Sequence, residues 1–218
     1  MRLHRLAVAA SAAAAITIPA QALAAPPSPH QLSIAAQPNP VVFGKPVAIT
    51  GKLTGDDSAG EDVTLREDPF PFGNFNNLGS TNTAADGTYK FTATPTVNTK
   101  YQATAKSKSP ATSPELTVTV ATRVGLVVSD TTPKVGQTVT FKGRVYPPHD
   151  GQNVLLQRKA KTGWKTVATI KLVDAGDTFS FYSRKRTVNT NGAFRVIKPA
   201  DSDHARGLSP KRTLTVHG

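Results

Sequence analysis

Residues 133–145 read PKVGQTVTFKGRV, and residues 41–53 read VVFGKPVAITGKL. Each segment has a glycine in its fourth position, followed by alternating apolar and polar side chains. The apolar positions are Val139, Phe141 and Val145 in one segment and Val47, Ile49 and Leu53 in the other. A period of two is typical of a β-strand that buries one face. The two segments therefore predict two equivalent half-buried strands.

The likeness between the two halves extends beyond these strands. The letters TVNT occur at 96–99 and again at 187–190, and each half closes with Ser-Pro followed by a threonine-rich strand pattern. A repeat of about 90 residues is longer than a solenoid repeat or a propeller blade and has the size of a small domain. We predict one β domain present twice, over 32–121 and 124–218.

After a Gly/Asp turn in each half, Tyr89 and Phe91 match Phe179 and Phe181, again two residues apart. Each half then shows about seven short strand patterns with turn signals every 8–12 residues, which is typical of an antiparallel sandwich. Gly51 and Gly143 lie on the apolar side of their strands, where a glycine usually marks a bulge or a close approach of backbone. The expected fold class is all-β.

Residues 1–24 have the order of a secretory signal peptide: two arginines, an apolar run over 6–18 and the small-residue motif ALA ending at Ala24. The apolar run is too short to span a bilayer, which takes about 20 residues. We expect cleavage after residue 24, a disordered Pro-rich lead over 25–31 and no transmembrane segment in the mature chain. The predicted location is secreted, or extracellular.

Three segments of the second half resemble a known family. VGQTVTFKG at 135–143, VLLQR at 154–158 and GWKTV at 163–167 are similar to the bacterial immunoglobulin-like repeats of secreted actinobacterial and other surface proteins. The resemblance implies two tandem Ig-like antiparallel β-sandwiches that serve as spacers, adhesin stalks or accessory binding modules. The chain has no cysteine, so these units would hold together without disulfides, which fits bacterial export better than eukaryotic secretion.

Positive charge is concentrated in the second half. Residues 123–218 hold 17 Lys/Arg and 6 Asp/Glu, whereas 31–122 hold 7 and 8. Such asymmetry indicates a polyanionic partner, although a merely solvated basic surface remains open. The candidate polyanion contacts are Arg158, Lys159, Lys161, Trp164, Lys165, Arg184, Lys185 and Arg186. For an exported protein the partner would be an anionic cell-wall or extracellular polymer; no nucleic-acid-binding motif occurs, so nucleic acid is disfavoured.

The first half contains an aromatic loop with Phe70, Phe72 and Phe75 among prolines and glycine. If exposed, it would be a contact surface; we favour the alternative, that the rings fold back and plug one end of the sandwich. The acidic turn over 56–62 could hold calcium, but a solvated turn is the preferred interpretation.

No catalytic motif occurs, and His149 and His204 fall in predicted loops without ligand spacing or an acidic cluster around them. We therefore predict no catalytic, cofactor-binding or metal-binding residues. The expected function is that of a secreted, non-catalytic spacer or adhesion/binding module. The alternative is a binder of an anionic wall or matrix polymer through the basic second half.

Overall fold

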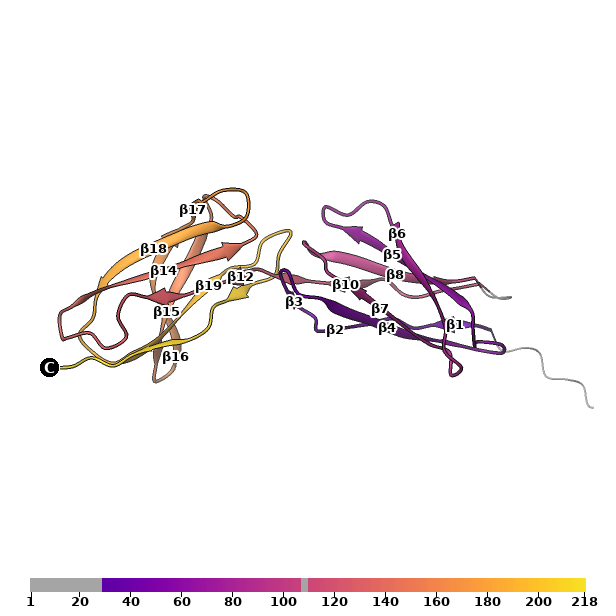
Figure 1. Ribbon diagram of the computed structural model, residues 1–218, viewed down its shortest axis with the longest axis horizontal. Coiled ribbons are helices and arrows are strands. Elements are labelled where there is room, and N and C mark those ends of the chain that lie inside the picture. The colour runs from indigo at the N-terminus through magenta and orange to yellow at the C-terminus, as the bar shows by residue number, and fades with distance from the viewer. Residues whose placement is uncertain (1–28, 107–109) are drawn as a thin grey trace, which may run out of the picture.

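The computed structural model describes residues 29–106 and 110–218, which form two elongated β units arranged end to end (Figure 1). Within these residues there is no helix, and thus none long and apolar enough to cross a membrane. The expectation of an all-β fold is confirmed. The predicted signal peptide over 1–24 and most of the predicted lead over 25–31 lie outside the described residues.

The first unit contains two sheets and a short parallel pair. One sheet has the order β1–β4–β2 with β7 also on β4, the other has the order β10–β8–β5–β6 with β9 also on β8, and β3 pairs in parallel with β11. The strands are β1 (Gln31–Leu32), β2 (Ala35–Gln37), β3 (Val41–Val42), β4 (Val47–Thr54), β5 (Asp62–Pro69), β6 (Asn76–Asn82), β7 (Thr88–Ala93), β8 (Thr99–Ala105), β9 (Ala111–Thr112), β10 (Leu116–Val118) and β11 (Val120–Ala121).

The second unit repeats this plan. One sheet has the order β12–β14–β18–β17 with β13 also on β14, and the other has the order β16–β15–β19–β20 with β21 also on β19. The strands are β12 (Arg123–Val124), β13 (Val127–Val128), β14 (Thr138–Tyr146), β15 (Asn153–Ala160), β16 (Gly163–Lys171), β17 (Val173–Asp174), β18 (Ser180–Thr187), β19 (Gly192–Lys198), β20 (Gly207–Leu208) and β21 (Arg212–Leu214).

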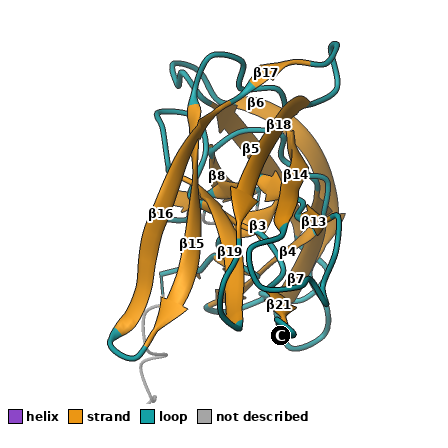
Figure 2. Cartoon of the chain, turned by 90° about the vertical axis from the view of Figure 1, so that its left-hand side faces the viewer, coloured by secondary structure: helices purple, strands orange, loops and turns teal. Residues whose placement is uncertain are grey.

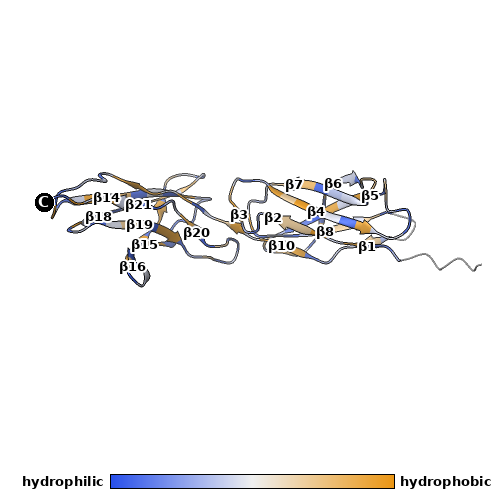
Figure 3. Cartoon of the chain, turned by 90° about the horizontal axis from the view of Figure 1, so that it is seen from below, coloured by the Kyte–Doolittle hydropathy of each residue, from blue (hydrophilic) through white to orange (hydrophobic). Residues whose placement is uncertain are grey.

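The alternating segments form the central strands β4 and β14, and their apolar side chains are buried as predicted. The fully buried positions are Val47, Ile49, Leu53, Val139, Phe141 and Val145. Figure 3 shows apolar and polar stretches interleaved along the strands of both units. Each unit has its own packed interior, because no hydrophobic cluster contains residues of both. Burial of these alternating side chains is the main force that holds each pair of sheets together.

A tyrosine in the second unit fills the space left by a strand glycine. Gly143 pairs with Tyr182 across β14 and β18, and the Tyr182 hydroxyl donates a 2.5 Å hydrogen bond to the Gly125 carbonyl, in the break between β12 and β13. A Cβ on Gly143 would overlap that carbonyl and lie 2.6 Å from the tyrosine hydroxyl. The expected close approach of backbone at this glycine is therefore confirmed.

The first unit has the same pairing of a strand glycine with a tyrosine. This pairing corrects the alignment of the two halves. Gly51 pairs with Tyr89, whose hydroxyl donates a 2.6 Å hydrogen bond to the Ser33 carbonyl between β1 and β2. Tyr89 is thus the counterpart of Tyr182, and its alignment with Phe179, like that of Phe91 with Phe181, is wrong.

The matching TVNT tetrapeptides are displaced by two residues in the fold. The Asn98 side chain accepts a hydrogen bond from the Val120 amide at 2.9 Å, and the Asn191 side chain accepts the equivalent bond from the Val216 amide at 2.6 Å. Asn98 therefore corresponds to Asn191 rather than to Asn189. The hydrogen bond from the last segment of each unit to the asparagine side chain, and not the identity of the four residues, determines which positions of the two loops correspond.

Replacing Gly51 with alanine should destabilise the first unit by about 1–3 kcal/mol, the usual cost of forcing an extra carbon into a filled site. The new methyl group would overlap the Ser33 carbonyl and the Tyr89 side chain. Gly79→Ala on β6 is the matched control, because a Cβ there has no neighbour within 4 Å. Urea unfolding of both variants would check this; an equal, small effect of the two would contradict the packing described.

The two units are joined by a short link and by a docked loop. Only Thr122 separates β11 from β12. The loop over 199–206, between β19 and β20, returns to the first unit: the Ala205 amide donates to the Val120 carbonyl at 2.8 Å, and the Asn98 amide donates to the Asp203 carbonyl at 2.8 Å. The junction is therefore held by main-chain hydrogen bonds on both sides of the link.

Candidate functional site

The β15–β16 hairpin and the end of β18 bring two predicted cationic residues together. Figure 2 looks along the molecule at the second unit and shows β15, β16 and β19 side by side. Arg158 on β15 and Arg186 on β18 line a pocket of about 160 Å³ whose remaining wall is Phe194 and the turn over 187–190. Its lining comes from β15 and β19 of one sheet and β18 of the other, so the pocket lies between the two sheets. Two guanidinium groups in one small polar hollow are suited to an anion.

Neutral oxygens hold the two guanidinium groups in place. Arg158 Nη2 donates to Thr190 Oγ1 at 2.6 Å and to the Asn191 carbonyl at 2.7 Å. Arg186 Nη1 donates to the Val167 carbonyl at 2.9 Å. Each guanidinium has five N–H donors in a planar fork, so donors remain for a ligand in both cases. The side chains are oriented without being neutralised.

The outer face of the same hairpin carries an aromatic and cationic stack. The Arg195 guanidinium lies 4.3 Å from the centroid of the Trp164 ring and the Lys159 ammonium lies 5.8 Å from it. Arg195 Nε also donates to Gln157 Oε1 at 3.0 Å. Burial, with the positive charge of Arg206 as a smaller cause, lowers the pKa of Arg195 from its usual value. Arg195 is a member of this cluster that the sequence interpretation missed.

The other predicted contacts are spread around this end of the unit. Lys165 pairs with Arg158 across β15 and β16, so strand alternation places it on the pocket side of the hairpin. Arg184 has the same parity on β18 as Arg186, whereas Lys185 faces the opposite side of its sheet. All of these, and Lys161 in the hairpin turn, are exposed except the half-buried Arg158. The structure thus gathers some of the predicted residues and disperses the others.

The acidic residues of the second unit do not neutralise this surface. Within 29–106 and 110–218, the ion pairs involve neither Arg158, Arg186 nor Lys159. Asp130 and Asp174 accept hydrogen bonds from backbone amides of their own turns. The positive potential of this end is therefore uncompensated by nearby carboxylates.

The three aromatic side chains of the loop in the first unit contact each other and nearby cationic side chains. Phe70 and Phe72 contact each other edge to face with their ring centroids 5.6 Å apart, and Arg66 lies over Phe75 at 5.4 Å. All three rings are half-buried and belong to neither hydrophobic cluster of the first unit. Lys100 lies over Phe72 at 5.3 Å, and the favoured expectation that the rings plug one end of the sandwich stays a prediction.

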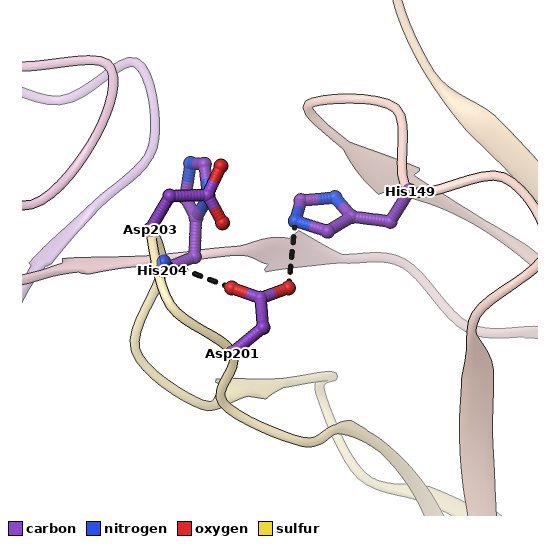
Figure 4. Close-up of side chains that lie close together, drawn as sticks. All are labelled: His149, Asp201, Asp203 and His204. Atoms are coloured by element: carbon purple, nitrogen blue, oxygen red, sulfur yellow. Dashed lines mark hydrogen bonds and ion pairs between the residues drawn. The ribbon is translucent and has the colours of Figure 1, made fainter. Parts of the chain in front are cut away.

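A second cluster lies at the junction, where no site was expected. His149 from the β14–β15 loop meets Asp201, Asp203 and His204 from the loop over 199–206 (Figure 4). One potential ligand atom from each residue lies within 4.8 Å of all the others, and among the described residues this is the one group of its kind. The expectation that no acidic cluster surrounds these histidines is wrong, because the fold brings two separate loops together.

The hydrogen bonds of the two imidazoles define their protonation. His149 Nδ1 lies 2.8 Å from the Pro147 carbonyl, and His204 Nε2 lies 2.8 Å from the Thr96 carbonyl. A carbonyl oxygen only accepts, so both of these nitrogens carry a hydrogen. In a neutral ring the other nitrogen then has a bare lone pair. His149 Nε2 faces Asp201 at 3.3 Å, and His204 Nδ1, which is buried and has no hydrogen-bond partner, faces Asp203.

The electrostatics of the cluster favour a neutral His149 and an ionised Asp201. Burial, together with the nearby positive Lys198, lowers the pKa of His149. Burial alone would raise the pKa of Asp201, but hydrogen bonds from Lys198, with Asp203 and from the His204 amide hold it below its usual value. Lys198 Nζ is 2.8 Å from Asp201 Oδ2, and its side chain is 1% exposed.

A sequence signal for this cluster exists and was overlooked. DSDH at 201–204 places three potential ligands within four residues, in a half that has few acids and few histidines. What the sequence does not give is the proximity of His149, which lies 52 residues before Asp201 on another loop and reaches the cluster only in the folded unit (Figure 4).

No protein-family model matches this sequence, and no curated protein matches it.

Proposed function

We propose that this chain is an exported, non-catalytic, immunoglobulin-like tandem module that binds an anionic polymer through the basic end of its second unit. The observation that carries the proposal is the convergence of Arg158 and Arg186 on one pocket with no carboxylate partner in the described residues. The partner class is a phosphate-, sulfate- or carboxylate-bearing polymer of the cell wall or the extracellular matrix.

The sheet topology supports the immunoglobulin-like class. In the first unit, the opening strands β1 and β2 share a sheet with β4 and β7, while β5, β6 and β8 share the other with the closing strands β9 and β10. This is the arrangement of A, B and E strands against C, F and G strands. The parallel pairing of β3 with β11 joins the opening segment to the closing one.

The dimensions of the basic end support a polymer rather than a small ligand. A pocket of about 160 Å³ is below the ~300–1,000 Å³ typical of sites that enclose a small molecule. It would hold one anionic group, while Lys159, Lys161 and Lys165 on the adjoining hairpin would meet further groups along a chain. Repeated weak contacts of this kind release counterions and so depend on salt.

The non-catalytic part of the proposal is supported by the character of an open hollow on the first unit. It has a volume of about 750 Å³ and lies in the first unit between β2, β4 and β7. Its lining contains Ser33, Tyr89 and Lys90 but neither histidine nor carboxylate side chains. A hydroxyl nucleophile there would have neither a histidine nor a carboxylate beside it as a general base.

Binding of a sulfated or phosphate-linked polymer should show a steep dependence on salt and should depend on the arginine pocket. Chromatography of the mature chain on immobilised heparin, and titration with inorganic polyphosphate, would measure this. Trp164 is the single tryptophan of the chain, so its fluorescence should change when the ligand reaches the nearby Lys159. The double variant Arg158→Gln/Arg186→Gln should bind at least about tenfold more weakly. The slope of log affinity against log salt concentration should also become less steep by about two.

The matched control is Lys142→Gln/Lys171→Gln, which removes the same charge from the same unit outside the pocket. It should reduce affinity clearly less than the arginine double variant. Equal losses in the two variants would mean that only total charge matters and would contradict a site. A chain that elutes from heparin at low salt would contradict the proposal altogether.

The junction favours a second candidate function, that of a spacer. The docked loop over 199–206 and the single-residue link restrict rotation of one unit against the other. Such a rod would hold an attached partner at a fixed distance. A pure spacer predicts the low-salt elution that the binding proposal excludes, so the same chromatography separates the two.

A further inference from the structure

We propose that His149, Asp201, Asp203 and His204 form a binding site for a divalent transition-metal ion of the zinc type, which fastens the loop over 199–206 at the junction of the two units. The inference is independent of polymer binding, because the cluster lies at the opposite end of the second unit from the arginine pocket. Its ligand atoms are His149 Nε2, Asp201 Oδ2, Asp203 Oδ1 and His204 Nδ1.

The spacing of these atoms fits a tetrahedral ion. Zinc binds imidazole nitrogen and carboxylate oxygen at about 2.0–2.2 Å, and tetrahedral angles then place neighbouring ligand atoms about 3.3–3.5 Å apart. His149 Nε2 and Asp201 Oδ2 are 3.3 Å apart, and His204 Nδ1 and Asp203 Oδ1 are 3.2 Å apart. Both nitrogen–oxygen pairs therefore already have the length of an edge of the zinc tetrahedron. The two pairs lie within 4.8 Å of each other, so a movement of about 1 Å closes the site.

The hydrogen bonds of the histidines prepare them as ligands. Each imidazole donates one N–H to a backbone carbonyl, of Pro147 in one case and of Thr96 in the other. This is the usual orienting contact of a metal-bound histidine, and it fixes the tautomer so that the other nitrogen has a free lone pair. Both free lone pairs face carboxylates, and a lone pair against a carboxylate is repulsive unless a proton or a metal cation lies between them.

One of these lone pairs has no hydrogen-bond donor among the described residues. His204 is 2% exposed, and its Nδ1 is buried without a hydrogen bond. A buried polar atom without a partner costs about 1–3 kcal/mol. A metal ion bound at Nδ1 removes this cost.

The donor set selects the kind of ion. Imidazole nitrogen suits zinc, copper and nickel, whereas calcium and magnesium take oxygen ligands almost exclusively. Two imidazoles and two carboxylates balance the charge of one divalent ion. Calcium is therefore not expected to compete at this site.

Lys198 sets an upper limit on the affinity. Its ammonium donates to Asp201 Oδ2 at 2.8 Å and to the Pro199 carbonyl at 3.0 Å. The same oxygen must accept the metal, so the ammonium opposes binding by like-charge repulsion. Lys198→Met should therefore bind the metal more tightly than the unmodified chain, in contrast to every substitution of a ligand.

The location of the site gives the metal a structural consequence. His204 Nε2 is bonded to Thr96 of the first unit, and the Asp203 carbonyl accepts the Asn98 amide. His149 is anchored in the second unit, where its amide donates to Ser180 Oγ at 2.6 Å. A bound ion would link these two sets of contacts in a chain that has no cysteine.

The test is titration of the chelator-stripped mature chain with Zn²⁺ by calorimetry and with Co²⁺ by visible absorption. We expect one ion per chain and the intense absorption bands of tetrahedral cobalt. Long-range ¹H–¹⁵N spectra of the histidines should show the metal at Nε2 of His149 and at Nδ1 of His204. Asp203→Asn and His149→Gln should each weaken binding at least tenfold.

His217→Gln is the control, because His217 is exposed near the C-terminus and lies outside the cluster. It should leave the affinity unchanged. Asp203→Asn keeps its backbone contacts to Asn98, and circular dichroism of each variant without metal verifies that it is folded. Absence of saturable binding, the same affinity in His149→Gln as in the control, or nuclear shifts at the opposite ring nitrogens would each overturn the proposal.

Discussion

Phe141→Ala is expected to destabilise the second unit by about 3–5 kcal/mol, which is the usual cost of truncating a buried aromatic ring. Phe141 is fully buried on β14, and its ring packs against that of Phe194 at a centroid distance of 4.8 Å. Those two rings come from opposite sheets and join them across the core. A loss of this size is a large fraction of the total stability of a small domain.

The effect should stay within the second unit, because the hydrophobic clusters do not cross the junction. Hydrogen exchange is the suitable measurement: amides of β14 and β19 should exchange faster, while those of Ile49 and Leu65 in the first unit should be unchanged. Val173→Ala is the control, since Val173 is 52% exposed and should change stability by less than about 0.5 kcal/mol. Equal acceleration in both units would contradict separate cores.

Asp201→Ala, measured with a chelator present, is expected to cost about 3–5 kcal/mol, because it leaves a buried ammonium without its partner. Lys198 is 1% exposed, and its carboxylate partner Asp201 is 19% exposed. The substitution also removes the acceptor of the His204 amide. Urea unfolding would measure the loss, and a value below about 1 kcal/mol would show that water screens the pair as it does at a surface.

A second substitution tests whether the lost stability comes from the unpaired charge. Lys198→Met in the Asp201→Ala background removes the ammonium and keeps an apolar stem of similar length. Replacing a whole buried pair by apolar groups is often neutral, so the double variant should recover more than half of the loss. A double variant as unstable as Asp201→Ala would instead assign the effect to the loop hydrogen bonds.

The strands of this fold could be predicted from the sequence because burial imposes a period of two. Val139 and Phe141 illustrate this: each is apolar, each is followed by a polar residue, and both are fully buried. Which residues of the two units correspond was harder to predict from the sequence. The TVNT letters suggested one alignment, but the hydrogen bonds of Asn98 and Asn191 to the closing strands require another. Identity of four letters carries no information about which amide a side chain meets.

The candidate sites could be predicted only in part, for a physical reason. The cationic residues of the β15–β16 hairpin are neighbours in sequence, so their grouping follows from strand alternation. The pocket formed by Arg158 and Arg186 depends on how the two sheets of the second unit face each other, and the junction cluster depends on how two separate loops of that unit meet. The alternation of residues along single strands predicts neither of these contacts. The contact of Arg66 with Phe75 likewise depends on how the aromatic loop folds against its sheet.

The parallel pairing of β3 with β11 has a consequence for how the first unit responds to tension. Both strands run in the same direction, so a pull on the two ends of the unit drags them in opposite directions along their length. The hydrogen bonds from Val41 to Thr119 and from Phe43 to Ala121, at 2.9 and 2.8 Å, would then be loaded in shear and would have to break together rather than one after another. Stretching should meet its main mechanical resistance at this pair of strands, next to the link that transmits the load.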